Sequence, residues 1–110
     1  MTQLNVLHIN ASSRYDGSLT RAVSTQLTEI LAGQNEMTLQ QRDVASGLTF
    51  IDENWINANF TDPADRNAAQ KEVLRFSDQL INEVKAADVL VLAVPIYNFG
   101  IPAALKAWID

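Results

Sequence analysis

Short apolar segments separated by amphipathic stretches predict three β-strands along the chain. They lie at residues 4–9, 37–40 and 88–94, and the first and third are rich in Val, Ile and Leu. The second is weaker and more polar, which is typical of an edge strand. After Asp88 the third segment is apolar without alternation, a pattern that indicates a central parallel strand covered on both faces.

The stretch after the first strand predicts a helix with defined ends. Ser18 precedes it, and a serine hydroxyl in that position accepts a free backbone N–H of the first turn. We expect Gly33 to end the helix, because glycine readily takes the left-handed conformation found at helix C-termini. One stripe of this helix is apolar and comprises Leu19, Ala22, Val23, Leu27, Ile30 and Leu31.

Residues 44–62 form a long connection with little periodicity, in which we predict a short helix over residues 53–60 capped by Asp52. A longer helix is expected to open at Asp62-Pro63, since proline suits the first helical position, where its missing N–H would be unpaired anyway. The expected buried stripe of that helix comprises Ala69, Val73, Phe76, Leu80 and Val84, with Ser77, Ile81 and Ala87 beside it.

Strands alternating with helices predict an α/β fold, in which a parallel sheet has helices on both faces. In such a doubly wound sheet, ligands bind beyond the carboxyl ends of the strands, where the strand order reverses. With a strand order of 2-1-3, that point lies between the first and third strands. The loops at residues 10–18 and 95–101 are therefore the candidate binding loops.

The first loop resembles an anion site. It supplies hydroxyls at Ser12, Ser18 and Thr20 and leads into a fresh helix N-terminus, whose free N–H groups favour negative charge. Arg14 or Arg21 would balance the charge. A plain serine-capped helix after a polar turn is the alternative interpretation, and on this loop alone it is the more common one.

The second loop runs from Pro95 to Pro102 and carries the sharper signal. Its two prolines and Gly100 stiffen the backbone, and Tyr97, Asn98 and Phe99 lie between them. Such a turn can present N–H groups to the acceptor atoms of a planar ring, and the two aromatic side chains can pack against that ring. The alternative is a Pro-Gly turn whose aromatics pack into the core.

The length, net charge and cysteine content of the chain exclude several classes of function. The chain has 110 residues, which suits one small domain. Its net charge of −5 argues against a nucleic-acid partner, because phosphate backbones are bound by clustered basic side chains. The absence of cysteine excludes thiolate chemistry. With no signal peptide and no apolar run long enough to span a bilayer, we expect a soluble, cytoplasmic protein without a membrane partner.

Several common sites are excluded by the residues present. No Gly-x-Gly-x-x-Gly or Gly-x-x-x-x-Gly-Lys-Ser/Thr segment occurs. The first strand ends in Asn10-Ala11-Ser12 and not in the carboxylate cluster of a metal-dependent receiver domain, so we expect no metal. His8 is the only histidine, which leaves no nucleophile–His–acid set, and we expect it to be a packing residue with satisfied nitrogens.

At the two loops the chain resembles the FMN-dependent NADH-azoreductases, a branch of the flavodoxin-like NAD(P)H:quinone oxidoreductases. Residues 95–110 resemble that family's Pro-Met-Tyr-Asn-Phe flavin loop and the following helix, and the first loop resembles its Ser-Pro-Arg phosphate loop. Ser13 and Ile96 depart from the family's usual Pro and Met. The resemblance implies FMN as cofactor, with its phosphate held by Ser12, Ser18, Leu19 and Thr20 and its ring contacted by Pro95, Ile96, Tyr97, Asn98 and Phe99.

The resemblance also implies a reaction and an assembly. NAD(P)H would pass a hydride to flavin N5 and leave, and a quinone or azo compound would then take it, so that no catalytic side chain is required. Family members are homodimers. Phe50, Trp55 and Phe60 are candidates for lining the substrate pocket, although core or interface packing is the more common role of such aromatics.

The resemblance covers only the front half of a typical family member. We therefore interpret residues 1–110 as a single flavodoxin-like domain truncated at its C-terminus, lacking strands 4 and 5 and the third flavin loop. We expect this segment alone to bind FMN weakly or not at all. An electron carrier of the flavodoxin type and a non-catalytic flavodoxin-like domain remain the alternative functions.

Overall fold

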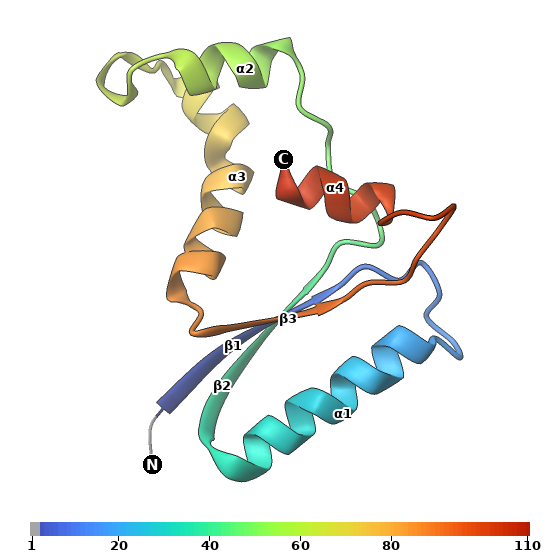
Figure 1. Cartoon of the computed structure of the whole chain (residues 1–110). Helices are drawn as coiled ribbons and strands as arrows, with labels where there is room; N and C mark the ends of the chain where they lie inside the picture. Colours follow the sequence, from blue (N-terminus) through green and yellow to red (C-terminus); the bar gives the residue numbers. More distant parts are fainter. Residues whose placement is uncertain (1–2) are drawn as a thin grey trace.

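Three parallel strands carry the fold in the computed structural model, which describes residues 3–110 (Figure 1). The elements follow in the order β1 (Gln3–Asn10), α1 (Leu19–Gln34), β2 (Glu36–Asp43), α2 (Glu53–Phe60), η1 (Pro63–Asp65), α3 (Ala68–Ala86), β3 (Val89–Ala93) and α4 (Ala103–Ile109). The strands pair in the order β2-β1-β3, so the predicted order 2-1-3 is confirmed. Within residues 3–110, no helix is long and apolar enough to cross a membrane.

The register of the sheet brings the carboxyl ends of all three strands to one level. Asn10 is the last residue of β1, and it pairs with Asp43 at the end of β2 and with Ala93 at the end of β3. The central strand of the described sheet is therefore β1, whose residues Val6 to Asn10 are all buried. The prediction of a central third strand is wrong for residues 3–110, where Leu90 and Leu92 on the edge strand β3 remain more than a third exposed.

The sheet is covered by α1 on one face and by α3 and α4 on the other (Figure 1). Because side chains of a strand alternate between faces, Leu7, Ile9 and Ala11 enter one buried cluster, in which Val44 and Leu105 of α4 also pack. The intervening residues of β1, including His8 and Asn10, face the side of α1. The apolar core thus lies between the sheet and α4.

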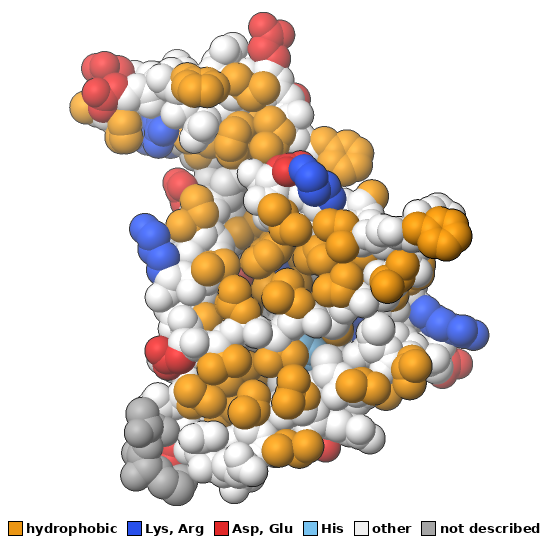
Figure 2. Space-filling view, viewed as in Figure 1, with side chains coloured by type: hydrophobic (Ala, Val, Ile, Leu, Met, Phe, Trp, Pro, Cys, Tyr) orange, Lys and Arg blue, Asp and Glu red, His pale blue; other side chains and the backbone are white. Residues whose placement is uncertain are grey.

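The predicted apolar stripes exist, but the described chain does not bury them. On α1, Leu19, Val23, Leu27 and Ile30 are 45–77% exposed, whereas Ser24 and Thr28 are buried. On α3, Leu74 and Glu83 are the buried residues, and Val73, Phe76 and Val84 remain more than a third exposed. Figure 2 shows apolar side chains gathered over α1 and between α3 and α4. The periodicity of both stripes is confirmed. The predicted burial of the α3 stripe is wrong for Val73, Phe76 and Val84, because the contacts made there cover the helix only in part: Trp55 of α2 donates to Ser77 at 2.9 Å, and the Arg42 guanidinium lies over the Phe76 ring.

Two predicted helix boundaries differ from the structure. Gly33 lies inside α1, which ends at Gln34, and Asn35 then closes the helix because its backbone N–H donates to the Leu31 carbonyl at 3.1 Å. Asp62-Pro63 opens only the single turn η1 and not the long helix. The short helix at Glu53–Phe60 is confirmed, with the Asp52 carboxylate accepting from the Trp55 N–H at 2.9 Å.

The long helix α3 begins at a reciprocal capping box. The Asn67 side chain accepts from the Gln70 backbone N–H at 2.8 Å, and the Gln70 side chain accepts from the Asn67 N–H at 3.1 Å. Both N–H groups would otherwise lack partners in the first turn. This cap, which the sequence reading missed, explains why the helix starts at Ala68.

Replacing Asn67 with Ala removes both hydrogen bonds of the capping box. We expect the free energy of unfolding to fall by about 1 kcal/mol, measured by urea denaturation followed by far-UV circular dichroism. Asn82→Ala is the matched control, since Asn82 is exposed inside α3 and the same substitution there slightly raises helix propensity. Equal effects of the two substitutions would contradict the capping role.

Candidate binding site at the carboxyl ends of β1 and β3

The two candidate loops leave the sheet side by side. Asn10 and Ala93 are register partners, and the Ala11 N–H donates to the Ala93 carbonyl at 3.0 Å. The loop before α1 and the loop before α4 therefore start from adjacent positions at the strand ends. This is the location at which ligands bind to open α/β sheets.

The first loop ends in a cluster of hydroxyls at the start of α1. Gly17 has a φ of +72°, a conformation that turns the chain into the helix and that residues with a Cβ rarely adopt. Ser18 is the N-cap, as predicted, and its Oγ accepts from the Arg21 N–H at 3.3 Å. The same Oγ lies 2.9 Å from Ser12 Oγ and 3.3 Å from Thr20 Oγ1. The backbone N–H groups of the first turn, which have no acceptor in a preceding helical turn, add further donors.

The Arg21 side chain stabilises this loop through hydrogen bonds and an ion pair. Its guanidinium donates to the carbonyl of Ser12 at 2.7 Å and to that of Arg14 at 3.1 Å, and forms an ion pair with Asp43 at 3.1 Å. The ring of Tyr15 stacks on the same group, 4.2 Å from ring centroid to Cζ. The Arg21 guanidinium therefore makes its contacts within the protein and stabilises the conformation of the loop. Arg14 is exposed and forms no ion pair within residues 3–110, so it is the arginine that remains available to an anion.

The second loop forms a tight turn with both central residues in the left-handed region. Asn98 has a φ of 50° and Phe99 a φ of 66°, and Tyr97 and Gly100 exchange backbone hydrogen bonds of 2.9 and 3.0 Å. Non-glycine residues in this conformation cost about 1 kcal/mol or more each, which the surrounding prolines and hydrogen bonds must offset. The turn leaves the Ile96 and Phe99 side chains 76% and 104% exposed, so the alternative of aromatics packed into the core is wrong for Phe99.

A hydrogen bond joins the two loops directly. The backbone N–H of Ser13 donates to the Tyr97 hydroxyl at 3.2 Å. This N–H lowers the pKa of Tyr97, with a smaller contribution from the Ser12 hydroxyl, because both interactions favour the phenolate. From the sequence, the Tyr97 ring was predicted to lie against a flat ligand. The contact with Ser13 could not be predicted, because only the adjacency of β1 and β3 creates it.

The structure brings together four of the nine residues predicted to bind the cofactor. Ser12, Ser18, Thr20 and Tyr97 are linked through the hydrogen bonds described above. Ser12, however, is only 2% exposed, and its Oγ is used within the loop, accepting from the Arg14 N–H at 3.2 Å. Ser12 therefore supports the loop, whereas the exposed first turn of α1 is the part open to a ligand. Asp43, which anchors Arg21, was not identified from the sequence, although its place at the end of β2 is a usable signal.

Behind the loops, polar groups are buried on the face that α1 covers. His8 is fully buried, and neither of its ring nitrogens has a hydrogen-bond partner within the described chain; the same holds for Asn10 Oδ1. The prediction of a satisfied packing histidine is therefore wrong with respect to its nitrogens. Burial lowers the pKa of His8, and the positive charge of Arg21 lowers it further, so the ring is neutral near pH 7.

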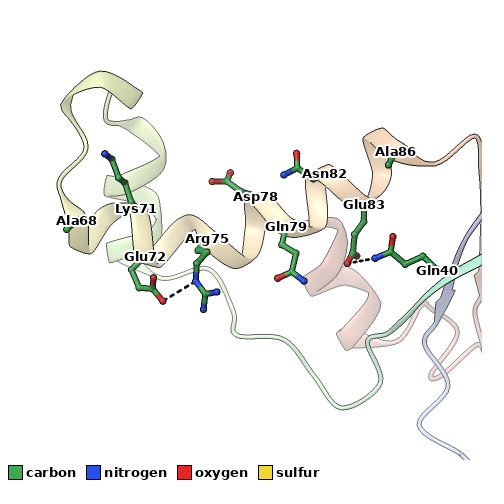
Figure 3. A pocket seen from close by; sticks show the side chains of 10 residues that line it. All are labelled: Gln40, Ala68, Lys71, Glu72, Arg75, Asp78, Gln79, Asn82, Glu83 and Ala86. Atoms are coloured by element: carbon green, nitrogen blue, oxygen red, sulfur yellow. Dashed lines mark hydrogen bonds and ion pairs between the residues drawn. The ribbon is translucent and has the colours of Figure 1, made fainter. Parts of the chain in front are cut away.

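The two larger hollows of the described chain lie apart from the loops. One is an open groove of about 820 Å³ along the polar face of α3, where Glu72 pairs with Arg75 and Gln40 donates to Glu83 (Figure 3). The other, of about 540 Å³, lies between α3 and α4, and Phe50 and Trp55 line it. Neither is lined by a residue of the two loops. A role for Phe50, Trp55 and Phe60 in a substrate pocket stays a prediction.

The parallel sheet of order 2-1-3, with helices on both faces and the two candidate loops at its carboxyl edge, defines a flavodoxin-like α/β fold. A family model described as flavodoxin-like fold matches residues 4–110. The chain belongs to this family.

Proteins similar to this chain include an FMN-dependent NADH:quinone oxidoreductase 1 of Jannaschia sp. (strain CCS1), 51% identical over 106 residues that make up 96% of this chain and 53% of that protein. The FMN-dependent NADH:quinone oxidoreductase of Thiobacillus denitrificans is 49% identical over 107 residues, covering 97% of this chain and 52% of that protein. The chain therefore spans about half the length of the curated relatives it matches.

Solved structures support the same fold. An FMN-dependent NADH-azoreductase from Bacillus anthracis str. Ames Ancestor, in complex with FMN, superposes with a TM-score of 0.79 at 23% identity, covering 96% of this chain and 54% of that one. The azoreductase AzrA gives a TM-score of 0.80 at 22% identity, with coverage of 96% and 54%.

Acidification should destabilise the chain through His8. Its folded-state pKa is lowered, so the unfolded chain binds the proton first, below about pH 6.5. The stabilising contribution is present above that pH and is lost as the pH falls toward the folded-state pKa. In urea denaturation at pH 7.5 and pH 5.5, His8→Leu should lose less stability between the two pH values than the wild-type chain. An equal loss would show that His8 takes up its proton equally in both states.

Proposed function

We propose that this chain forms the FMN-binding part of an NADH-dependent quinone oxidoreductase. The observation that carries the proposal is the Ser13–Tyr97 hydrogen bond, because it holds a hydroxyl-rich helix start and an exposed turn next to each other at the carboxyl edge of the sheet. The names of the relatives from Jannaschia and Thiobacillus, which are FMN-dependent NADH:quinone oxidoreductases, support it.

The chemistry of the residues fits the two ends of FMN. Ser18, Thr20 and the first N–H groups of α1 are hydrogen-bond donors at a positive helix end, which suits a phosphate. The exposed apolar side chains of Ile96 and Phe99 beside a stiff turn suit a flat ring that shields them from water. With Arg21 already paired to Asp43, the phosphate would be held chiefly by hydroxyl and N–H groups.

In this proposal Ser12, Ser18, Leu19 and Thr20 belong to the phosphate end. The backbone of the turn, at Pro95, Ile96, Tyr97, Asn98 and Phe99, contacts the ring. FMN, when bound, supplies the chemistry of hydride acceptance and donation, so the protein contributes binding and orientation. Backbone N–H groups of the turn near Asn98 would stabilise negative charge that develops at the ring edge.

The substrates proposed are NADH as donor and a quinone as acceptor, exchanged in turn at one site in a ping-pong sequence. Azo compounds, which also accept electron pairs into a conjugated system, are proposed as further acceptors. NADPH as donor, homodimer assembly and a cytoplasmic location stay predictions.

An FMN titration with matched variants tests the phosphate end. FMN fluorescence should be quenched as the protein binds it, and Thr20→Val, which removes one hydroxyl at constant shape, should weaken FMN binding about tenfold or more. Riboflavin, which lacks the phosphate, should bind equally to both proteins. Thr25→Val, the same substitution at an exposed position of α1, should change neither affinity.

The titration is made on this chain and on a chimera that joins it to the remaining half of the Jannaschia relative, because the chain spans half of that protein. The FMN-loaded chimera should then oxidise NADH when a water-soluble benzoquinone is added. Failure of both proteins to bind FMN would favour a non-catalytic domain. FMN binding without NADH oxidation would favour an electron carrier.

A further inference from the structure

We propose that Tyr97 acts at the phosphate end of the site and not at the ring: its hydroxyl is a phosphate donor held in place by the Ser13 N–H, and it makes the site prefer FMN to riboflavin. The inference rests on the proposed function and assigns to this side chain a positioning and specificity role. It follows from where the hydroxyl lies and from which of its hydrogen-bonding capacities is used.

The position of the hydroxyl comes from the bond between the loops. The turn at Tyr97–Gly100 is closed by two backbone hydrogen bonds, and from it the Tyr97 side chain reaches back to the first loop, where Ser13 N–H donates to it at 3.2 Å. Ser12, the neighbour of Ser13, contacts Ser18 at the start of α1 through their hydroxyls at 2.9 Å. The hydroxyl of Tyr97 thus lies against the loop whose hydroxyls and helix end suit an anion.

The proton of this hydroxyl is available. A tyrosine hydroxyl can both accept and donate, and the bond from Ser13 uses it as an acceptor. Within residues 3–110 no acceptor takes its proton by a hydrogen bond of good geometry. An acceptor oxygen bound at the helix start would meet an oriented donor, and hydrogen bonds from neutral donors to an anion are shorter and stronger than those between neutral groups.

The electrostatic surroundings agree with a donor role. The Ser13 N–H and the Ser12 hydroxyl lower the pKa of Tyr97, and the positive charge of Arg21 acts in the same direction. A more acidic hydroxyl is a better hydrogen-bond donor to a phosphate oxygen. Since Arg21 is paired with Asp43, this neutral donor adds to the site without bringing a further unpaired charge.

The first test is an ultraviolet titration of tyrosine ionisation near 295 nm, with inorganic phosphate as the probe. The chain has two tyrosines, so Tyr97→Phe identifies the contribution of Tyr97, and Tyr15→Phe is the matched control. Saturating phosphate should raise the pKa of Tyr97, because a neighbouring anion opposes formation of the phenolate. Circular dichroism checks that each variant folds. A pKa that phosphate leaves unchanged would overturn the inference.

The second test compares FMN with riboflavin on the wild type and the variants. Tyr97→Phe should weaken FMN binding about tenfold and leave riboflavin binding within about twofold, whereas Tyr15→Phe should leave the ratio of the two affinities unchanged. A ratio that survives Tyr97→Phe, in a protein that binds FMN, would overturn this inference and leave the proposed function standing. Phosphate binding that raises the Tyr97 pKa, without any binding of FMN, would support the donor role of the hydroxyl but refute the proposed function and, with it, the preference for FMN.

The third test addresses the role of Ser13. Ser13→Pro removes the N–H that positions Tyr97, whereas Ser13→Ala keeps it. Ser13→Pro should raise the pKa of Tyr97 toward its ordinary value, and Ser13→Ala should not. Because proline is the family's usual residue at this position, FMN binding should survive Ser13→Pro. A Tyr97 pKa that Ser13→Pro leaves unchanged would show that the Ser13 N–H does not hold the hydroxyl.

Discussion

The candidate site depends on one constraint, the strand register that places the carboxyl ends of β1, β2 and β3 side by side. Asn10 of β1 pairs with both Asp43 of β2 and Ala93 of β3, so three connections leave the sheet at one edge. Arg21 reaches Asp43 across that edge, and Tyr97 reaches Ser13. A shift of one residue in either pairing would also turn each side chain of that strand to the opposite face. Because β1 is buried over Val6 to Asn10, such a shift would be strongly disfavoured.

The site separates the groups that hold the loops from the groups that remain open to a ligand. Ser12 and Arg21 make their hydrogen bonds within the protein and keep the first loop in one shape. Ser18 joins that network and caps the helix, while the start of α1 and the hydroxyl of Tyr97 keep donor capacity. Preorganised donors of this kind bind without further loss of conformational freedom. Asn98 and Phe99 are preorganised in the same way. The energetic cost of their left-handed backbone conformation is met when the chain folds, so it does not reduce the free energy of ligand binding.

Amphipathic periodicity and actual burial proved to be different properties in this chain. The stripe of α1 that begins at Leu19 has the spacing of a core-facing surface, yet the residues that α1 buries are Ser24 and Thr28. The face of β1 beneath α1 carries His8 and Asn10 as well as Val6, and their register partners on β3 are Val91 and Ala93, so the contact between this helix and the sheet mixes polar and apolar groups. A hydrophobic stripe indicates that burying this surface would be favourable. Which segment covers it depends on the rest of the fold.

The sequence by itself determined the strand and helix order, the strand order, the caps at Ser18 and Asp52, and the two loops of the candidate site. These depend on local spacing and on general rules for parallel sheets. Only the tertiary structure decided that His8 is buried without a partner, that Gly33 stays helical, that Asp43 anchors Arg21 and that Tyr97 bonds to Ser13. Ser13 and Tyr97 are 84 residues apart, and a contact over that distance arises from strand register and side-chain reach, which no local pattern encodes.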